Sequence, residues 1–405
     1  MKIPATSPAI ILIFFSVLFL FSHPLDEKQF STTADEGYYF RYASLISEEG
    51  IAVYPKLIAD YAHNEKTRFY PAPSRIGYLL PAALLFKMFG PSYSLLAGIS
   101  LFSFLSFLIV FFYFCRKHFG NNIAVFSTVL LSSSPLLLAM SRRALTDSTA
   151  NLTWGLTAWL FLDYLVHRKQ NTYSALILSL ACAILIKESS LVLFPFLFIT
   201  TLVYNSFHGQ KKVKLICLGG IFLWPVIIVL TAFLLTLGGP AQFLQAIQGI
   251  LLTHFNSPLS NPYNLFSTGP WYRYIVDFLL LSPVTTLLFI GYAFYLVAIR
   301  SNDWKKIYFL LYFILVYGFS NLLQYSKVIR FVMNLDMVIC LFSVLALYEL
   351  FGGQNQGKGE KYLRISCLII FFINFYTFLT MFYIGGLYDP ISYHLLALRK
   401  FILPH

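Results

Sequence analysis

Apolar residues fall in long uninterrupted runs along this chain, separated by short polar segments. Each run is apolar all round, which is typical of a helix in lipid and unlike the alternating strands of a membrane barrel. Because roughly 20 apolar residues cross a bilayer, the pattern predicts about eleven spans. These lie near residues 5–22, 93–115, 122–140, 148–166, 172–188, 190–207, 214–237, 273–298, 307–324, 329–350 and 364–386.

The composition agrees with an all-α, polytopic transmembrane bundle. Hydrophobic residues make up 58% of the 405 residues and charged residues only 11%, and the mean hydropathy is +0.71. A soluble globule could not bury so much apolar surface. The five cysteines fall within expected spans or at their ends, which argues against a disulfide framework or a cysteine zinc site. No small-residue cleavage pattern follows the first run, so we expect it to remain as the first span.

The formal charge of +12 is mainly a topology signal, because many of the basic residues lie in alternate short loops. By the positive-inside rule, these loops face the cytoplasm. The opposite side then receives the segments 23–92 and 238–272 and the short turns between the remaining spans. We find no basic patch on a soluble face, which excludes nucleic-acid binding. The basic loop residues are Arg116, Lys117, Arg168, Lys169, Lys211, Lys212, Lys214, Arg300, Lys305, Lys306, Lys358, Lys361 and Arg364.

The chain is predicted to form a single integral membrane domain, residues 1–405, with two long outer loops. In the first loop, residues 23–92, the stretch 76–89 is too interrupted to be a span and is expected to lie along the membrane as an amphipathic helix. In the second loop, residues 238–272, proline, asparagine and aromatic residues mix, as suits contact with a sugar or an acceptor. The alternative is an interfacial aromatic belt without further function. Asp336, inside the expected tenth span, should face the bundle interior.

Asp35 and Glu36 stand side by side just beyond the first span. Two adjacent carboxylates beside a bilayer call for an explanation in a chain this poor in charge, although solvated loop acids are the simpler alternative. Further polar segments follow in a fixed order. They are Ile76–Gly90 with its proline, Phe114–Gly120, Ser141–Ser148 and Leu185–Ser189.

Together these segments resemble the membrane-embedded glycosyltransferases of the GT-C fold, in the superfamily of protein O-mannosyltransferases and lipid A aminoarabinose transferases. The resemblance extends to about residue 210 and is looser beyond it. It implies transfer of a sugar from a polyprenyl-phosphate carrier to an acceptor hydroxyl on the outer face of the membrane. The acceptor stays open between a glycan, a lipid and a protein. We expect the location to be a bacterial inner membrane, and the positive-inside topology puts the active site on the periplasmic or extracellular side.

The resemblance implies that Asp35 is the general base, and a carboxylate suits the removal of a proton from an attacking hydroxyl. Glu36 is then an orienting neighbour, since adjacent side chains point in different directions. Asp147 is a third candidate for the catalytic group, with helix capping as the alternative. A divalent cation is left open, with Glu36 and Asp147 as its ligands if one is bound.

Cations are needed to hold the phosphate of the donor. Arg330, Lys327 and Lys187 are the candidates, with snorkelling to the interface as the alternative. For Lys187, an internal ion pair with Glu188 is a further alternative. Arg142 and Arg143 are expected to pair with Asp147 or to meet lipid phosphates. Candidate contacts to the sugar or the acceptor are Tyr38, Arg142, Glu188, His254 and Asn264.

A transporter or flippase for a lipid-linked substrate is the rival function. It would need similar cations, but its polar groups should spread through the midplane and across both halves of the chain. Here the acids concentrate at the outer ends of the expected spans, which favours an enzyme that works on one side of the membrane.

Overall fold

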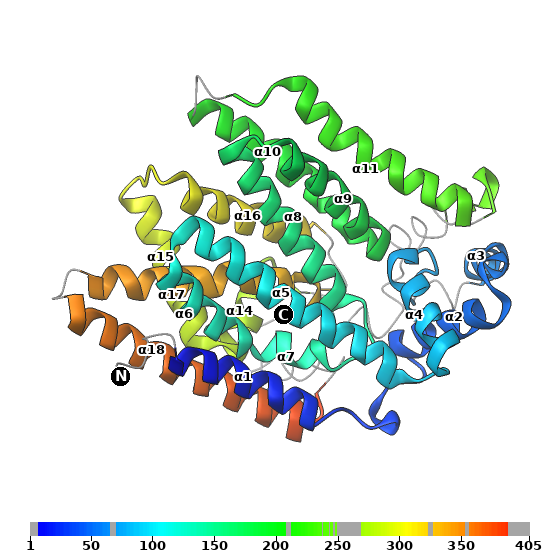
Figure 1. The fold of residues 1–405 in the computed structure, drawn as a ribbon, viewed down its shortest axis with the longest axis horizontal. Helices are drawn as coiled ribbons and strands as arrows, with labels where there is room; N and C mark the ends of the chain where they lie inside the picture. The colour runs from blue at the N-terminus through cyan, green and yellow to red at the C-terminus, as the bar shows by residue number, and fades with distance from the viewer. Residues whose placement is uncertain are drawn as a thin grey trace. The chain divides into compact units, whose positions relative to one another are not determined.

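A computed structural model describes residues 7–64, 70–207, 212–236, 238–242, 244–245, 248, 269–322, 327–352 and 356–387. Within these ranges the chain forms helices and no strand, which confirms the all-α class (Figure 1). The helices divide between two compact units. The first unit comprises the described residues of Met1–His23, Leu105–Met140 and Pro262–His405, and the second those of Pro24–Phe104 and Ser141–Asn261. One helix, α5 (Tyr93–Phe119), runs from the second unit into the first.

In the first unit, α17 (Asp336–Gly352) contacts α6, α15 and α18, and most of its side chains are buried. Asp336 is buried as expected and accepts a hydrogen bond from Ser134 Oγ at 2.6 Å. The other helical elements are α1 (Ser7–Ser22), α6 (Asn121–Ser132), α7 (Pro135–Ser141), α14 (Arg273–Leu281), α15 (Pro283–Ala298), α16 (Trp304–Ser320), η5 (Ile329–Leu335), α18 (Gln356–Thr377) and the π-helix η6 (Phe378–Ile384).

Two of the expected spans of the first unit are broken by proline. The run 122–140 forms α6 and α7, which meet at an angle of 62°, and the run 273–298 forms α14 and α15. Pro135 and Pro283 begin the second helix of each pair. Proline has no N–H to donate and disfavours helical geometry in the residue before it, so each run stops and restarts.

The second unit contains a helical hairpin of α8 (Asp147–His167) and α9 (Gln170–Ile186), whose helices contact each other. At its connection, the guanidinium of Arg168 lies over the rings of Tyr164 and Tyr204 at 5.2 and 5.0 Å. A helix of 21 residues is about 31 Å long, so Asp147 lies a bilayer thickness from this basic connection. Beyond the hairpin come η4 (Glu188–Val192), α10 (Leu193–Phe207) and α11 (Leu215–Thr236), and α11 packs on α9.

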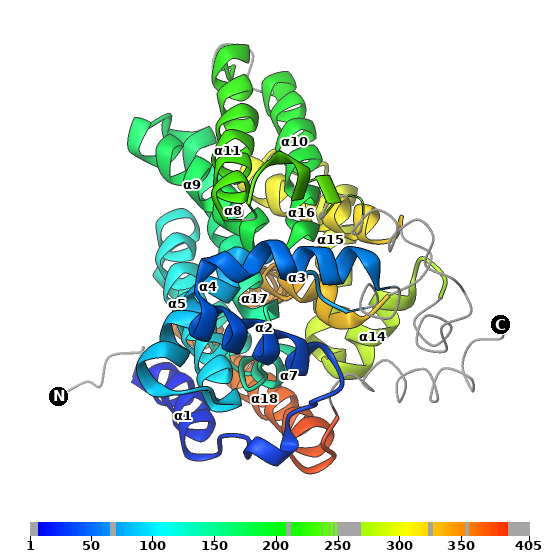
Figure 2. The same ribbon diagram turned by 90° about the vertical axis from the view of Figure 1, so that its right-hand side faces the viewer.

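The expected first outer loop folds into η1 (Glu27–Gln29), α2 (Asp35–Glu49), η2 (Ile51–Val53), α3 (Tyr54–His63) and α4 (Ile76–Phe89). Figures 1 and 2 show α2, α3 and α4 side by side. The predicted helix over 76–89 is therefore present, and it packs on α2 and α9. A Cβ on Gly77 would come within 3.0 Å of the backbone of Leu185, so glycine permits this close approach. The sequence did not point to α3, whose buried face is formed by Tyr54, Leu57, Ile58 and Tyr61.

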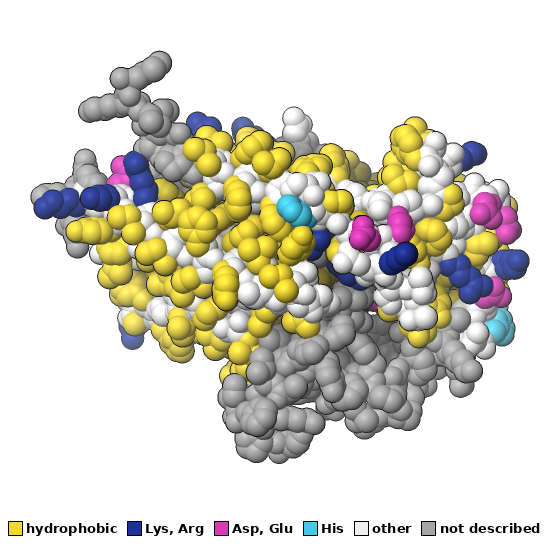
Figure 3. All heavy atoms as spheres, turned by 90° about the horizontal axis from the view of Figure 1, so that it is seen from below, with side chains coloured by type: hydrophobic (Ala, Val, Ile, Leu, Met, Phe, Trp, Pro, Cys, Tyr) yellow, Lys and Arg dark blue, Asp and Glu magenta, His cyan; other side chains and the backbone are white. Residues whose placement is uncertain are grey.

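Five helices in the described ranges are long and apolar enough to cross a membrane, or six if the bent pair α6 and α7 is one span. The predicted number of about eleven is therefore not confirmed by length and composition. Helix α8 is not among the five, since its first turns carry Asp147, Ser148, Thr149 and Asn151. Hydrophobic side chains cover much of the face in Figure 3, as expected of an integral membrane protein. The five are Tyr93–Phe119, Glu188–Phe207, Ile216–Thr236, Ile329–Phe351 and Lys358–Ile384.

Candidate active site

The first turn of α2 carries Asp35 and Glu36, where carboxylates suit the positive end of the helix. The loop before it folds back onto this turn, and the backbone N–H of Ser31 donates to Glu36 Oε2 at 2.8 Å. A Cβ on Gly37 would lie 2.0 Å from the carbonyl oxygen of Thr32. Glycine is therefore required for the loop to pack against the helix.

Glu36 is fully buried and is held by a cation and two amides. Arg143 donates from Nε to Oε1 at 2.9 Å and from Nη2 to Oε2 at 2.5 Å. The N–H of Ala144 donates to Oε1 at 3.0 Å. The same guanidinium lies 5.6 Å from the ring of Phe30. With both oxygens engaged, Glu36 fixes the start of α2 against the segment that leads into α8.

Asp147 and Lys187 form a second buried pair at the open end of the α8–α9 hairpin. Lys187 Nζ lies 2.7 Å from Asp147 Oδ1, and the two residues are 8% and 4% exposed. Asp147 therefore pairs with Lys187, whereas the sequence pointed to Arg142 or Arg143 as its partner. Lys187 has an extended backbone directly after α9, at φ −155° and ψ 124°, which turns the chain into η4.

Arg75 is a residue that the sequence reasoning missed. It precedes α4 and donates to Glu188 from Nε at 3.0 Å and from Nη2 at 2.5 Å, so Glu188 has Arg75 as a partner. The guanidinium also donates to the hydroxyl of Tyr39, which lies 3.2 Å from Thr146 Oγ1. One signal was available, because a cation at the start of a helix opposes the helix dipole and needs an acidic partner.

Asp35 is half-buried, and its negative charge contributes to the raised pKa of the Tyr39 phenol. Burial alone would lower the pKa of Arg75, but the charge of Glu188, followed by Tyr39 and Asp35, raises it well above the ordinary value. The guanidinium is therefore held in its charged form. Burial raises the pKa of the Tyr39 phenol, so this group stays protonated.

The remaining predicted site residues lie in several places. Arg142 is buried in the second unit, whereas Tyr38 is half-buried and stacks on Tyr70 with ring centroids 4.1 Å apart. Lys327 and Arg330 belong to the first unit. The predicted contacts His254 and Asn264 lie outside the described residues.

The two cations of the first unit are both buried. Lys327 Nζ donates to the carbonyl of Gly269 at 2.7 Å, and the guanidinium of Arg330 lies 5.4 Å from the ring of Phe331. Burial, and secondarily the charge of Arg273, lowers the pKa of Lys327. Arg273 itself lies close to an acid, with its Nε 3.7 Å from Asp277 Oδ2.

The two residues considered for a metal each face a cation. Glu36 pairs with Arg143, and Asp147 pairs with Lys187. In the part of the chain that the structure describes, no three His, Cys, Asp or Glu residues are grouped so that they could hold an ion.

Residues 75–234 match the family described as dolichyl-phosphate-mannose-protein mannosyltransferase. The match includes Arg75, Arg143, Asp147, Lys187 and Glu188, while the Asp35–Glu36 pair precedes it. No curated protein matches the sequence.

Solved structures match over most of the chain. The oligosaccharyltransferase of Archaeoglobus fulgidus in its apo form is 12% identical, with a TM-score of 0.60, over 96% of this chain and 56% of that one. ArnT from Cupriavidus metallidurans in the apo state is 16% identical, with a TM-score of 0.56, over 88% of this chain and 60% of that one. The structure of the same ArnT bound to undecaprenyl phosphate is 16% identical, with a TM-score of 0.53, over 98% of this chain and 72% of that one.

The chain thus spans somewhat more than half the length of the first two of these proteins. At such low identity the likeness concerns the fold, and the family match concerns residues 75–234. Both agree with the resemblance seen in the sequence. The chain is a helical membrane protein with the GT-C fold, and its residues 75–234 carry the sequence pattern of the dolichyl-phosphate-mannose-protein mannosyltransferases.

Proposed function

We propose that this protein is a glycosyltransferase that moves a sugar from a polyprenyl-phosphate donor to an acceptor hydroxyl on the outer face of the membrane, with Asp35 as general base. One observation carries the proposal. Asp35 is half-buried at the start of α2, and three ion pairs hold the segments around it: Glu36–Arg143, Asp147–Lys187 and Arg75–Glu188. Such fixed charges orient a base without needing to move during the reaction.

The proposed reaction is a single displacement at the anomeric carbon of the donor sugar. The acceptor oxygen attacks the anomeric carbon, its proton passes to the Asp35 carboxylate, and the bond from that carbon to the phosphate oxygen breaks. The electron pair leaves with the polyprenyl phosphate. Attack opposite the leaving group inverts the anomeric centre.

Arg75 is the cation that we propose to act together with Asp35. It is held charged by Glu188 and feels the charge of Asp35, so it can stabilise negative charge on the phosphate or on the acceptor oxygen. Lys187 is paired with Asp147, and we propose that this pair fixes the open end of the hairpin. Lys327 and Arg330 are retained as proposed phosphate ligands of the first unit. Undecaprenyl phosphate in the ArnT structure is in line with a lipid-phosphate leaving group.

The proposed side of the membrane follows from the hairpin. Arg168 and Lys169 lie at its connection, and the positive-inside rule puts that end in the cytoplasm. The other end of α8 lies about 31 Å away. Asp147 and Lys187 would then lie at the outer surface of the bilayer.

The test uses purified full-length protein in lipid nanodiscs with radiolabelled polyprenyl-phosphate sugars and a panel of glycan, lipid and peptide acceptors. Wild type should transfer label, and Asp35→Asn should be slower by about 10²–10⁴-fold, the usual contribution of a general base. Glu48→Gln, a change at an exposed position of the same helix, should leave the rate unchanged. Full activity in Asp35→Asn would remove the proposed base. Lipid translocation without transfer would instead identify a transporter.

A further inference from the structure

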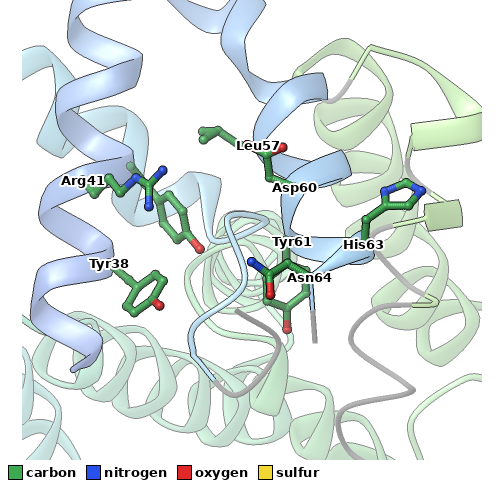
Figure 4. A pocket seen from close by; sticks show the side chains of 8 residues that line it. Tyr38, Arg41, Leu57, Asp60, Tyr61, His63 and Asn64 are labelled. Atoms are coloured by element: carbon green, nitrogen blue, oxygen red, sulfur yellow. The ribbon is translucent and has the colours of Figure 1, made fainter. Parts of the chain in front are cut away.

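A pocket of about 410 Å³ opens between α2 and α3 in the second unit (Figure 4). Its volume falls in the range of about 300–1,000 Å³ typical of small-molecule sites. Tyr38 and Arg41 project into it from α2, opposite Tyr61 and Asn64. Tyr42, Leu57, Asp60 and His63 complete the described lining.

The pocket begins one helical turn from Asp35. Asp35, Tyr38 and Tyr42 are spaced i, i+3 and i+7 along α2, so they lie on one side of the helix. Three residues rise about 4.5 Å along a helix axis. A group bound against Tyr38 would therefore lie on the same side of α2 as the Asp35 carboxylate, about one helical turn along the helix.

Ring faces and hydrogen-bonding groups are combined in this pocket. Tyr42 and Tyr61 are buried, and Tyr38 lies 6.0 Å from Tyr42 with its ring tilted by 59°. Tyr38 is also stacked on Tyr70, which fixes its orientation. Arg41 and Asp60 are exposed at the rim. Their opposite charges balance, so the pocket favours a neutral ligand over an anionic headgroup.

A neutral ligand that suits tyrosine faces as well as donors and acceptors is a pyranose. Its C–H face packs on an aromatic ring, while its hydroxyls accept from guanidinium and amide groups and donate to a carboxylate. We infer that the pocket binds a sugar unit of the acceptor, so that the acceptor is a saccharide or a glycolipid. This inference rests on the proposed function and names its acceptor class.

Direct binding provides the first test. The probes are the methyl α-glycosides of glucose, mannose and galactose, titrated against purified protein in nanodiscs and followed by saturation-transfer NMR. At least one should bind saturably, and Tyr38→Ala, Arg41→Gln and Asp60→Asn should each weaken it about tenfold or more. Arg41 and Asp60 are exposed, so their variants should fold even if Tyr38→Ala does not. Glu48→Gln serves as the control. No saturable binding, or equal binding by wild type and the three variants, would overturn the inference.

A second measurement separates this inference from the proposed function. Asp35→Asn should bind the glycoside as wild type does while losing transfer. Asp60→Asn should raise the KM for the acceptor about tenfold and leave the KM for the donor unchanged. If Asp35→Asn abolishes transfer but Asp60→Asn leaves the acceptor KM unchanged, the proposed glycosyltransferase function is supported and the proposed saccharide site is contradicted. If wild type binds the glycoside and transfers nothing, the proposed function fails.

Discussion

Glu36 and Arg143 are joined by two hydrogen bonds, at 2.9 and 2.5 Å, although they are 107 residues apart in the chain. The carboxylate is fully buried and the arginine side chain is 10% exposed. Removing one partner leaves a buried charge uncompensated, which costs on the order of 3–5 kcal/mol. We therefore expect Glu36→Gln to lower the thermal midpoint in detergent by several degrees. Replacing both residues, as Glu36→Gln with Arg143→Met, should recover part of the loss. A Glu36→Gln protein as stable as the exposed variant Glu48→Gln would contradict the pairing.

Gly37→Ala should disturb the site without changing any charge. The new methyl group would lie 2.0 Å from the Thr32 carbonyl oxygen, and overpacking of this kind costs about 1–3 kcal/mol. The loop would have to move, taking with it the N–H of Ser31 that holds Glu36. We expect reduced transfer and faster proteolysis within residues 24–34. Gly98→Ala, in α5 with no neighbour within 4 Å of the added carbon, is the matched control and should behave as wild type.

Asp147 and Lys187 should show strong energetic coupling, because both are buried and 2.7 Å apart. A double-mutant cycle with Asp147→Asn and Lys187→Met, measured by unfolding in detergent, should give an interaction of about 1–3 kcal/mol. Additive effects within about 0.3 kcal/mol would show that the two residues act independently.

We expect donor binding to depend on pH through the ammonium group of Lys327. Its pKa is lowered by burial and by Arg273, so the ammonium loses its proton at a lower pH than the usual 10.5. The proposed contact with the donor phosphate needs the charged side chain, so it is expected below this pKa and lost above it. The KM for the donor should therefore rise as the pH approaches 10.5 from below. In Lys327→Arg the KM should stay level over the same range, and Lys56→Arg should follow wild type. Identical profiles for wild type and Lys327→Arg would exclude this role.

The helices could be predicted from the sequence because hydrophobic runs and proline breaks are local. The runs at 93–115 and 172–188 match α5 and α9 within a few residues. The number of spans was harder, because α8 begins with a polar stretch that is buried in the protein and because several apolar helices have fewer than 18 residues. These shorter helices include Ala9–Ser22, Gln170–Ile186 and Pro283–Ala298. In α8, burial in the protein has replaced burial in lipid.

The pairing of charges could not be predicted from the sequence. Asp35 and Glu36 were conspicuous as neighbours, yet which of them is buried depends on which way α2 faces after it packs. The partners Arg75 and Glu188 are 113 residues apart, and nothing local links them. The adjacent residues Lys187 and Glu188 suggested a local ion pair. In the structure, Lys187 pairs with Asp147 and Glu188 pairs with Arg75.

The separation between Glu36 and Arg143 also sets the order in which the protein can mature. The segment that holds Asp35 is synthesised first, and at about 5–20 residues per second the ribosome needs several further seconds to reach Arg143. Lys187 and Glu188 follow later still. During that interval Glu36 does not yet have Arg143 as its partner. The proposed site would therefore be completed only when the α8–α9 hairpin has inserted, so a nascent or truncated chain that ends before it would carry Asp35 without catalysing transfer.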